Sequence, residues 1–262
     1  MENRIYFTSS IPYIISQYIR EYDISKANIN ILLYKGVIDI DKYNFLYNAD
    51  RMTRQVYIGK MIRNNSNIGN ILKYGIKEMI DKFIMCNNIE DQDILSLKND
   101  AIFIINKIPT ITKFENIEFK NKNTYTSYLN INGIEVYYNL DQINSTEQID
   151  IKGINDDKLL IHQNYFINFL CEYLYNIENM RSEENLRWFK DFYNKYVNLQ
   201  LDTGYYITFD SISSIKTIDI GMYNYNIIGY NTQKNIIDIS YNLNILRLLY
   251  RYLLEIHFNN KK

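Results

Sequence analysis

The sequence predicts an α+β protein, with its helices and its strands in separate stretches of the chain. Apolar residues recur at helical spacing between residues 24 and 87, whereas residues 114–138 alternate between apolar and polar in period two. Asn132-Gly133, which separates two alternating stretches, is a strong signal for a β-hairpin turn. Helical stretches followed by runs of antiparallel strands are typical of the α+β class.

The first helical stretch follows a segment of mixed character. Residues 13–22 carry both strand and helix signals, and Asp23 lies where they give way to the helical spacing of residues 24–36. We therefore expect Asp23 at the corner between a strand and a helix. Further helices are expected over residues 39–47 and 68–87.

The helix expected after Asp50 lies in a basic stretch. Asp50 is a typical N-cap residue for a helix over residues 51–63. Helical spacing predicts that Met52, Val56 and residues 58–61 face inward, and that Arg51, Arg54 and Arg63 face out. Every charged residue of the range 51–77 is basic, which predicts either a phosphate-binding patch or solvated helix faces.

Strands are expected after these helices. Residues 93–105 are apolar on both sides of Lys98-Asn99-Asp100, which predicts two strands joined at a tight turn. Later helices are expected over residues 158–179, 182–199 and 241–258, with β-rich structure over 202–240. We expect a first domain over residues 1–155 and a second over 156–262.

Several common classes of protein are excluded by the composition. The two cysteines and two histidines are too few for a disulfide framework or a Cys/His zinc site. His162 and His257 lie in apolar helical settings, so no serine or cysteine nucleophile has a credible base. Glycine-rich phosphate loops are absent. The apolar runs are too short for a membrane span, which predicts a cytoplasmic protein with no membrane partner.

The amino-acid usage points to a source rather than to a chemistry. The chain is rich in Ile, Asn, Lys and Tyr, with 26 tyrosines, and these residues share A/T-rich codons. A viral or bacteriophage protein from an AT-rich genome is therefore expected. The tyrosine count is correspondingly weak evidence for a binding surface.

Asp23 and Asp100 are the remaining candidates for catalysis. Asp23 is expected at the end of an apolar strand, and Asp100 in the turn that joins two apolar strands. Two carboxylates on adjacent strands are the minimum for a two-metal site for phosphoryl transfer. Mg²⁺ prefers a few carboxylates and completes its shell with water and substrate phosphates. The alternatives are that Asp23 caps a helix and that Asp100 forms a turn.

Taken in order, three segments resemble the motifs of the palm of family B DNA polymerases. Asp23 is similar to the aspartate that closes a strand in the first motif. Gln55, Lys60 and Asn65-Ser66-Asn67-Ile68-Gly69 look like the helix and Asn-Ser-x-Tyr-Gly end of the second motif. Lys98-Asn99-Asp100-Ala101 is similar to the Asp-Thr-Asp-Ser turn of the third.

Two later segments extend the resemblance to roughly residues 18–155. Residues 122–125 are a loose counterpart of the family's Lys-Lys-Arg-Tyr segment, and Asp150-Ile151-Lys152-Gly153 is a close counterpart of its Asp-Ile-Lys-Gly segment. The resemblance implies a polymerase-like palm with an antiparallel sheet and short helical fingers at about residues 41–70. A mostly helical, thumb-like part would then cover residues 156–262.

The same resemblance implies the roles of individual residues. Asp23 and Asp100 would be catalytic and hold Mg²⁺ or Mn²⁺. Nucleotide contacts would come from Arg54, Lys60, Asn65, Ser66 and Gly69, and contacts with primer-template DNA from Lys122, Tyr125 and Lys152. Lys98 replaces the first aspartate of the third motif. Its ammonium is expected to compete with the metal ion, which leaves catalytic activity open.

The leading expectation is thus a polymerase-like nucleotidyltransferase, as a fragment or split subunit, that binds primer-template DNA and nucleotides in the cytoplasm of a host cell. A separately encoded polymerase or replication subunit is a candidate partner. One alternative is a catalytically inactive, palm-derived accessory or regulatory protein that binds nucleic acid or a protein partner. Another alternative is a virion structural protein.

Overall fold

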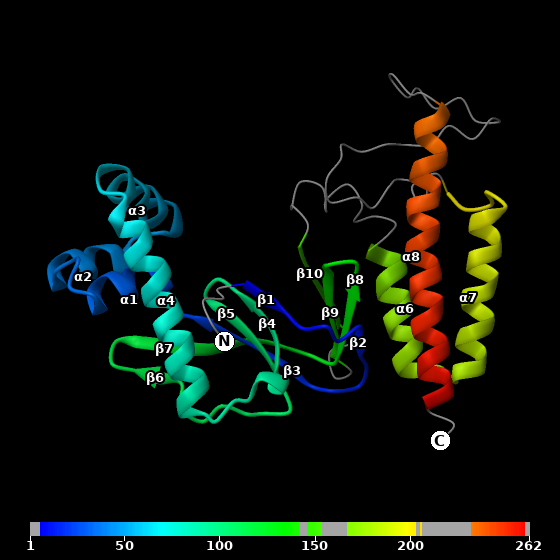
Figure 1. Ribbon diagram of the computed structural model, residues 1–262, viewed down its shortest axis with the longest axis horizontal. Helices are drawn as coiled ribbons and strands as arrows, with labels where there is room; N and C mark the ends of the chain where they lie inside the picture. Colours follow the sequence, from blue (N-terminus) through cyan, green and yellow to red (C-terminus); the bar gives the residue numbers. More distant parts are fainter. Residues whose placement is uncertain (1–5, 142–145, 154–166, 203–204, 206–231, 260–262) are drawn as a thin grey trace. The chain divides into compact units, whose positions relative to one another are not determined.

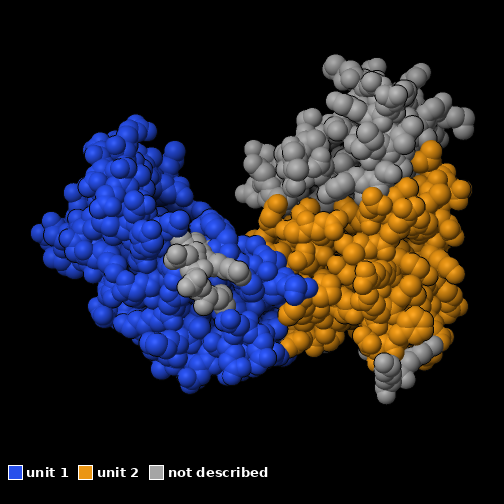
Figure 2. All heavy atoms as spheres, in the orientation of Figure 1, with its two compact units in different colours: residues 1–10, 18–124 blue, residues 11–17, 125–262 orange. Residues whose placement is uncertain are grey.

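The fold is that of a computed structural model, which describes residues 6–141, 146–153, 167–202, 205 and 232–259 (Figure 1). The chain divides into two compact units (Figure 2). The first unit contains residues 1–10 and 18–124, and the second contains residues 11–17 and 125–262. The chain therefore passes between the two units three times rather than completing one before the other.

A mostly antiparallel sheet forms the centre of the first unit. Its six strands lie in the order β1 (Tyr6–Thr8), β4 (Ile94–Lys98), β5 (Ala101–Ile105), β3 (Ile19–Ile24), β7 (Ile117–Tyr125) and β6 (Lys113–Phe114). The pairs β1/β4, β4/β5, β3/β5 and β6/β7 are antiparallel. Antiparallel sheets and helices in separate stretches confirm the predicted α+β class.

The helices of the first unit follow β3 directly. They are α1 (Ala27–Tyr34), α2 (Ile40–Asn48), α3 (Arg51–Asn64) and α4 (Asn67–Cys86), and the short 3₁₀ helix η1 (Asp91–Asp93) leads into β4. Asp50 accepts a hydrogen bond from the backbone N–H of Thr53 at 2.9 Å, as expected of the N-cap of α3. Asp39 caps α2 in the same way.

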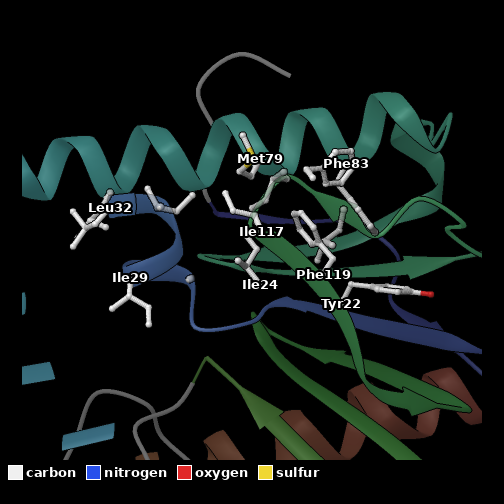
Figure 3. Close-up of a cluster of buried hydrophobic side chains, with 14 of the residues drawn as sticks. Tyr22, Ile24, Ile29, Leu32, Met79, Phe83, Ile117 and Phe119 are labelled. Carbon is white, nitrogen blue, oxygen red and sulfur yellow. The ribbon is translucent and has the colours of Figure 1, made fainter. Parts of the chain in front are cut away.

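Helix α4 covers one face of this sheet, and the side chains packed between them form the main core of the unit. Figure 3 shows Met79 and Phe83 of α4 directed toward Ile24 of β3 and toward Ile117 and Phe119 of β7. The rings of Phe83 and Phe119 stack with their centroids 4.2 Å apart. Packing against α4 therefore fixes which face of β3 is buried, and so which side chains of β3 lie on the opposite face.

The close contact of α4 with α1 depends on Gly75. A Cβ atom at this position would lie 2.4 Å from Cγ2 of the buried Ile31. Real Cβ atoms do not approach so closely, so a larger residue would force α1 away from α4. Gly75 therefore helps to determine how closely α1 packs on α4.

Helix α3 agrees with the sequence expectation in part. Ile58, predicted to face inward, is buried, whereas Met52 and Val56, also predicted to face inward, are 74% and 50% exposed. The prediction was wrong for Met52 and Val56 because spacing alone does not say which stripe of a helix is covered. Here the face with Ile58 packs on the unit, while the face with Met52 and Val56 remains open.

The second unit is built on a four-stranded antiparallel sheet. Its strands lie in the order β10 (Thr146–Lys152), β9 (Ile134–Asp141), β8 (Ser127–Ile131) and β2 (Tyr13–Ile14). Asn132 and Gly133 join β8 to β9 with φ angles of 53° and 92°, which confirms the predicted hairpin. Helices α6 (Asn168–Asn179), α7 (Ser182–Val197) and α8 (Thr232–Asn259) complete the unit.

The second unit differs from the expected pattern in two respects. The two units divide between residues 124 and 125 rather than near residue 155, because β8, β9 and β10 pair with one another and share a core with α6, α7 and α8. Helix α8 begins at Thr232, inside the range 202–240 that was predicted to be β-rich. The rest of that prediction falls largely on residues 206–231, which lie outside the described residues.

None of the described helices combines the length and the apolar character that crossing a membrane requires.

Candidate active site

Asp23 and Asp100 come together at neighbouring strand ends of the first unit. Asp23 of β3 pairs with Ala101 of β5, and the backbone N–H of Ile24 donates to the carbonyl oxygen of Asp100 at 3.1 Å. Asp100 belongs to the tight turn between β4 and β5, and α1 begins at Ala27. The sequence therefore placed both aspartates correctly at strand ends, and the sheet makes them neighbours.

The alternation of β3 determines which side chains accompany Asp23. Tyr22 and Ile24 point into the core beneath α4. Because successive side chains of a strand point to opposite faces, Glu21 and Asp23 share the other face of the sheet. The site thus has a second acidic group on β3, and the side chain of Glu21 is only 2% exposed.

The environment of Asp23 disfavours its charged form. Burial, followed by the negative charge of Asp100, raises the pKa of Asp23 from 3.8 to about 6, while Lys122 acts in the opposite direction. One carboxylate oxygen, Oδ1, is buried and has no hydrogen-bond partner. An acid held in this way would gain stability from an added cation or donor.

Lys122 and Asn123, neighbours at the end of β7, lie against these acids. The ammonium of Lys122 is 3.6 Å from Oε1 of Glu21 and 3.9 Å from Oδ2 of Asp23. The side-chain amide of Asn123 donates to Oε2 of Glu21 at 2.7 Å. The buried carboxylate of Glu21 therefore has partners, whereas Asp23 is paired on one oxygen at most.

A pocket of about 260 Å³ connects Asp100 with α1 and α3. Asp100 lies on its wall together with the first residues of α1 and one face of α3. The α3 residues Arg51, Arg54 and Gln55 recur at i, i+3 and i+4, so they share this face. The predicted nucleotide contact Arg54 is therefore near Asp100, and it also donates to the carbonyl of Ala49.

The residues present are suited to a divalent cation shared with a ligand. Asp23 and Asp100 are hard oxygen donors, and the buried Oδ1 of Asp23 has no hydrogen-bond partner. Within the part of the chain that the structure describes, no group of three or more His, Cys, Asp or Glu residues could hold a metal ion. A cation here would therefore take two carboxylates and complete its shell with water and phosphate oxygens, as Mg²⁺ commonly does.

Lys98 ends strand β4 and precedes the turn that contains Asp100. Its ammonium donates to the hydroxyl of Thr8 on β1 at 3.0 Å. Lys98 pairs with Ala101, which in turn pairs with Asp23, so strand β5 separates Lys98 from Asp23. The cation that acts on Asp23 is instead Lys122, which the sequence had assigned to the primer strand.

The other predicted nucleotide contacts are not part of this pocket. Lys60 lines a different hollow, of about 440 Å³, which also contains Met52 and Val56. Asn65 accepts from the backbone N–H of Asn67, so it helps to turn the chain from α3 into α4. Neither Ser66 nor Gly69 lines the Asp100 pocket.

Ser66 and Gly69 both lie at the start of α4. Ser66 occupies the N-cap position of α4, but its side chain makes no capping hydrogen bond. A Cβ atom at Gly69 would have Ile62 Cγ2 as its nearest neighbour, at an ordinary 3.8 Å. No close approach requires a glycine there, in contrast to Gly75.

Tyr125 and Lys152, predicted to contact DNA, meet in the second unit. Tyr125 is fully buried and donates its hydroxyl to Asp150 at 3.1 Å, while Lys152 forms an ion pair with Asp150 at 2.6 Å. Burial leaves Tyr125 no surface for a DNA strand, so its predicted role is replaced by an internal contact. Lys122 belongs to the first unit.

Sequence reasoning missed several residues of the site. Glu21 could have been found from the two-residue spacing to Asp23 on a strand, and Arg51 from its helical spacing to Arg54. Lys26 also lines the pocket, and its ammonium donates to the carbonyl of Tyr47 at 2.7 Å. No local signal identifies this contact, because it joins α1 to the end of α2.

The fold and the site define an α+β protein with paired carboxylates beside a cationic pocket. The sequence profile described as bacteriophage PBS1 gene 130 protein matches residues 1–255, and the chain belongs to this family. A phage family agrees with the source expected from the amino-acid usage. No curated protein matches the chain significantly.

Proposed function

We propose that this chain is a polymerase-like nucleotidyltransferase subunit that acts on DNA in the cytoplasm of the host. The observation that carries the proposal is the meeting of Asp23 and Asp100 at adjacent strand ends beside the cationic face of α3. A carboxylate pair next to cations suits phosphoryl transfer, in which charge develops on phosphate oxygens. The order of the motifs along the chain, which resembles that of a family B polymerase palm, is a second support for the proposal.

The pocket residues would position the phosphates of a nucleotide. Arg51 and Arg54 carry planar guanidinium groups, which match phosphate oxygens with two parallel hydrogen bonds. The first turn of α1, which also lines the pocket, adds free backbone N–H groups and the positive end of a helix dipole. Gln55 would add a neutral donor and acceptor between them.

Asp23 and Asp100 would hold Mg²⁺ or Mn²⁺, which supplies positive charge at the reacting phosphate when bound. Asp23 contributes its unpartnered oxygen, and burial keeps water from competing for it. Asp100 belongs both to the carboxylate pair and to the wall of the phosphate pocket. Asp100 would therefore place the bound cation next to the nucleotide phosphates in the pocket.

Helix α3 would make the main contact with the DNA backbone. It contains Arg51, Arg54, Lys60 and Arg63 and no acidic residue. The whole chain has a net charge of −1, so attraction to DNA must be local to such a surface. Because contacts of this kind release counterions, affinity for primer-template DNA should fall steeply as salt rises.

The direct test is incorporation of a labelled nucleotide on primer-template DNA with Mg²⁺ or Mn²⁺, with and without a separately encoded phage polymerase subunit. Asp23→Asn and Asp100→Asn should each abolish incorporation. Asp81→Asn is the matched control, because Asp81 is an exposed aspartate of the same unit. Incorporation that is insensitive to both site variants, or that is absent in every combination, would reject the enzymatic proposal.

A second candidate is a catalytically inactive, palm-derived protein that still binds nucleic acid. The observation that favours it is the ammonium of Lys122 beside Glu21 and Asp23, which already supplies positive charge to the acids. This candidate expects salt-dependent DNA binding that is unchanged in Asp100→Asn. It also expects no incorporation by the wild-type chain with any partner.

A further inference from the structure

The acidic site contains a cation that belongs to the chain itself. Glu21 and Asp23 share one face of β3, and Asp100 lies beside Asp23 in the turn before β5. The ammonium of Lys122 lies within 4.0 Å of two of them, at 3.6 Å from Glu21 and 3.9 Å from Asp23. It thus lies where a divalent cation bound to Asp23 would meet an opposing positive charge.

Lys122 is placed so that it can leave this position without loss of the fold. Its side chain is 52% exposed, and it lies near the end of β7 rather than in the core. Glu21 keeps the hydrogen bond from Asn123 at 2.7 Å when the ammonium moves away. The ion pair is also longer than a direct charge-assisted hydrogen bond, which is about 2.7–2.9 Å.

We propose that Lys122 is an internal counter-ion that competes with a divalent cation for Asp23 and thereby sets the cation affinity of the site. This inference rests on the proposed function, since it assumes that Asp23 and Asp100 take up a cation. With no metal bound, the ammonium offsets the repulsion among the carboxylates. A divalent cation that enters must displace the ammonium or bind against its repulsion, which weakens binding.

The role differs from that of a DNA contact, which the sequence resemblance assigned to this lysine. A lysine that contacts DNA would leave metal affinity in the absence of DNA unchanged. A counter-ion changes metal affinity in the free protein. The two roles are therefore separated by a measurement made with no nucleic acid present.

The test is the dissociation constant of Mn²⁺, measured for the full chain by electron paramagnetic resonance of free Mn²⁺. Lys122→Met keeps the apolar stem and removes the charge, and it should tighten Mn²⁺ binding by about tenfold, as expected for one charge near 4 Å after screening by solvent. Lys120→Met is the matched control. It removes the same charge from the same strand, where Lys120 pairs with Glu118, and should change the constant less than about twofold.

A second variant keeps the inference testable if Lys122→Met fails to fold. Lys122→Arg retains the charge and offers a planar fork that can engage the two carboxylates together. It should weaken Mn²⁺ binding several-fold relative to wild type. Opposite changes in the two Lys122 variants would support the counter-ion role.

The remaining outcomes distinguish this inference from the proposed function. If Mn²⁺ binds to the wild type in an Asp100-dependent way and Lys122→Met and Lys122→Arg leave its affinity unchanged, the counter-ion role is rejected while the proposed function stands. If neither the wild type nor Lys122→Met binds Mn²⁺ in a manner lost in Asp100→Asn, both are rejected.

Discussion

Glu135 of the second unit and Asp23 of the first unit are acids with contrasting surroundings. In the second unit, Glu135 is fully buried and accepts hydrogen bonds from the hydroxyls of Tyr128 and Tyr137 at 3.4 and 3.5 Å. In the first unit, Asp23 has a buried oxygen without a partner and a second carboxyl group beside it. The acceptor of Glu135 is therefore satisfied within the protein, whereas one oxygen of Asp23 is not.

The tyrosines beside Glu135 act as hydrogen-bond donors. Burial, followed by the charge of Glu135, raises the pKa of Tyr128 well above its usual value, so the hydroxyl keeps its proton. Asp150 is satisfied in a similar way by Tyr125 and Lys152. An acid surrounded by such donors has a structural role, and this contrast is the reason for proposing a functional role for Asp23 and Asp100.

Removal of Glu135 should have the largest effect on stability. Glu135→Ala leaves the buried hydroxyls of Tyr128 and Tyr137 without this acceptor, so the free energy of unfolding should fall by about 3 kcal/mol in urea denaturation. Glu135→Gln keeps an acceptor and should lose about 1 kcal/mol. A loss for Glu135→Ala no greater than that of the exposed control Asp81→Asn would contradict the structural role of this acid.

Removal of the charge at Asp23 should have the opposite sign. Its folded-state pKa of about 6 lies above the unfolded value of 3.8, so the native state binds the proton more tightly and loses stability as pH rises from about 4 to 6. Above pH 6, Asp23→Asn should therefore unfold with a free energy about 2 kcal/mol higher than wild type. Equal stability of the two proteins at pH 4 is the internal control.

The same variant connects stability with function. Asp23→Asn should be more stable than wild type at pH 8 and inactive in nucleotide incorporation. A variant that is less stable than wild type at pH 8 would show that Asp23 is a structural acid like Glu135, and the comparison between the two units would fail.

Removal of one arginine from the cationic face of α3 should have a smaller effect, and this effect should be on DNA affinity. Arg51→Ala removes one cation of the pocket wall, so affinity for primer-template DNA should fall about threefold to tenfold. The slope of log affinity against log salt concentration should also become shallower by about one, because one fewer counterion is released. Arg251→Ala in the second unit is the control, because Arg251 pairs with Glu255 on its own helix. Equal losses in both variants, measured by fluorescence anisotropy, would remove the distinction between the units.

The smallest effect is expected at Tyr125. Tyr125→Phe deletes one hydrogen bond to Asp150 and should lower the free energy of unfolding by about 1 kcal/mol. Incorporation and DNA affinity should not change, because the side chain is buried. A clear loss of DNA affinity with unchanged stability would restore the role that the sequence resemblance gave to this tyrosine.

The sequence was informative wherever the signal was local. Asp50 was recognised as an N-cap, Asn132-Gly133 as a hairpin turn, and Asp23 and Asp100 as residues at strand ends. Each of these follows from the preferences of a few consecutive residues. The meeting of the two aspartates also needed the pairing of β3 with β5, which was expected only through the resemblance.

The rest of the site depends on contacts between distant parts of the chain. Lys122 reaches Asp23 because β7 lies next to β3 in the sheet, an order that no single segment encodes. Lys98 lies apart from Asp23 because β5 intervenes. The exposure of Met52 and Val56 likewise depends on which stripe of α3 meets the rest of the unit.

Strand β2 gives the chain an unusual order of construction. Residues 11–17 belong to the second unit, where β2 pairs with β8, and the rings of Tyr13 and Tyr252 lie with their centroids 5.3 Å apart. During synthesis on the ribosome, β2 emerges before the helices and most strands of the first unit, and it must wait for β8 and α8. A cut between residues 124 and 125 would therefore not give two independent halves, since the C-terminal piece would lack its edge strand.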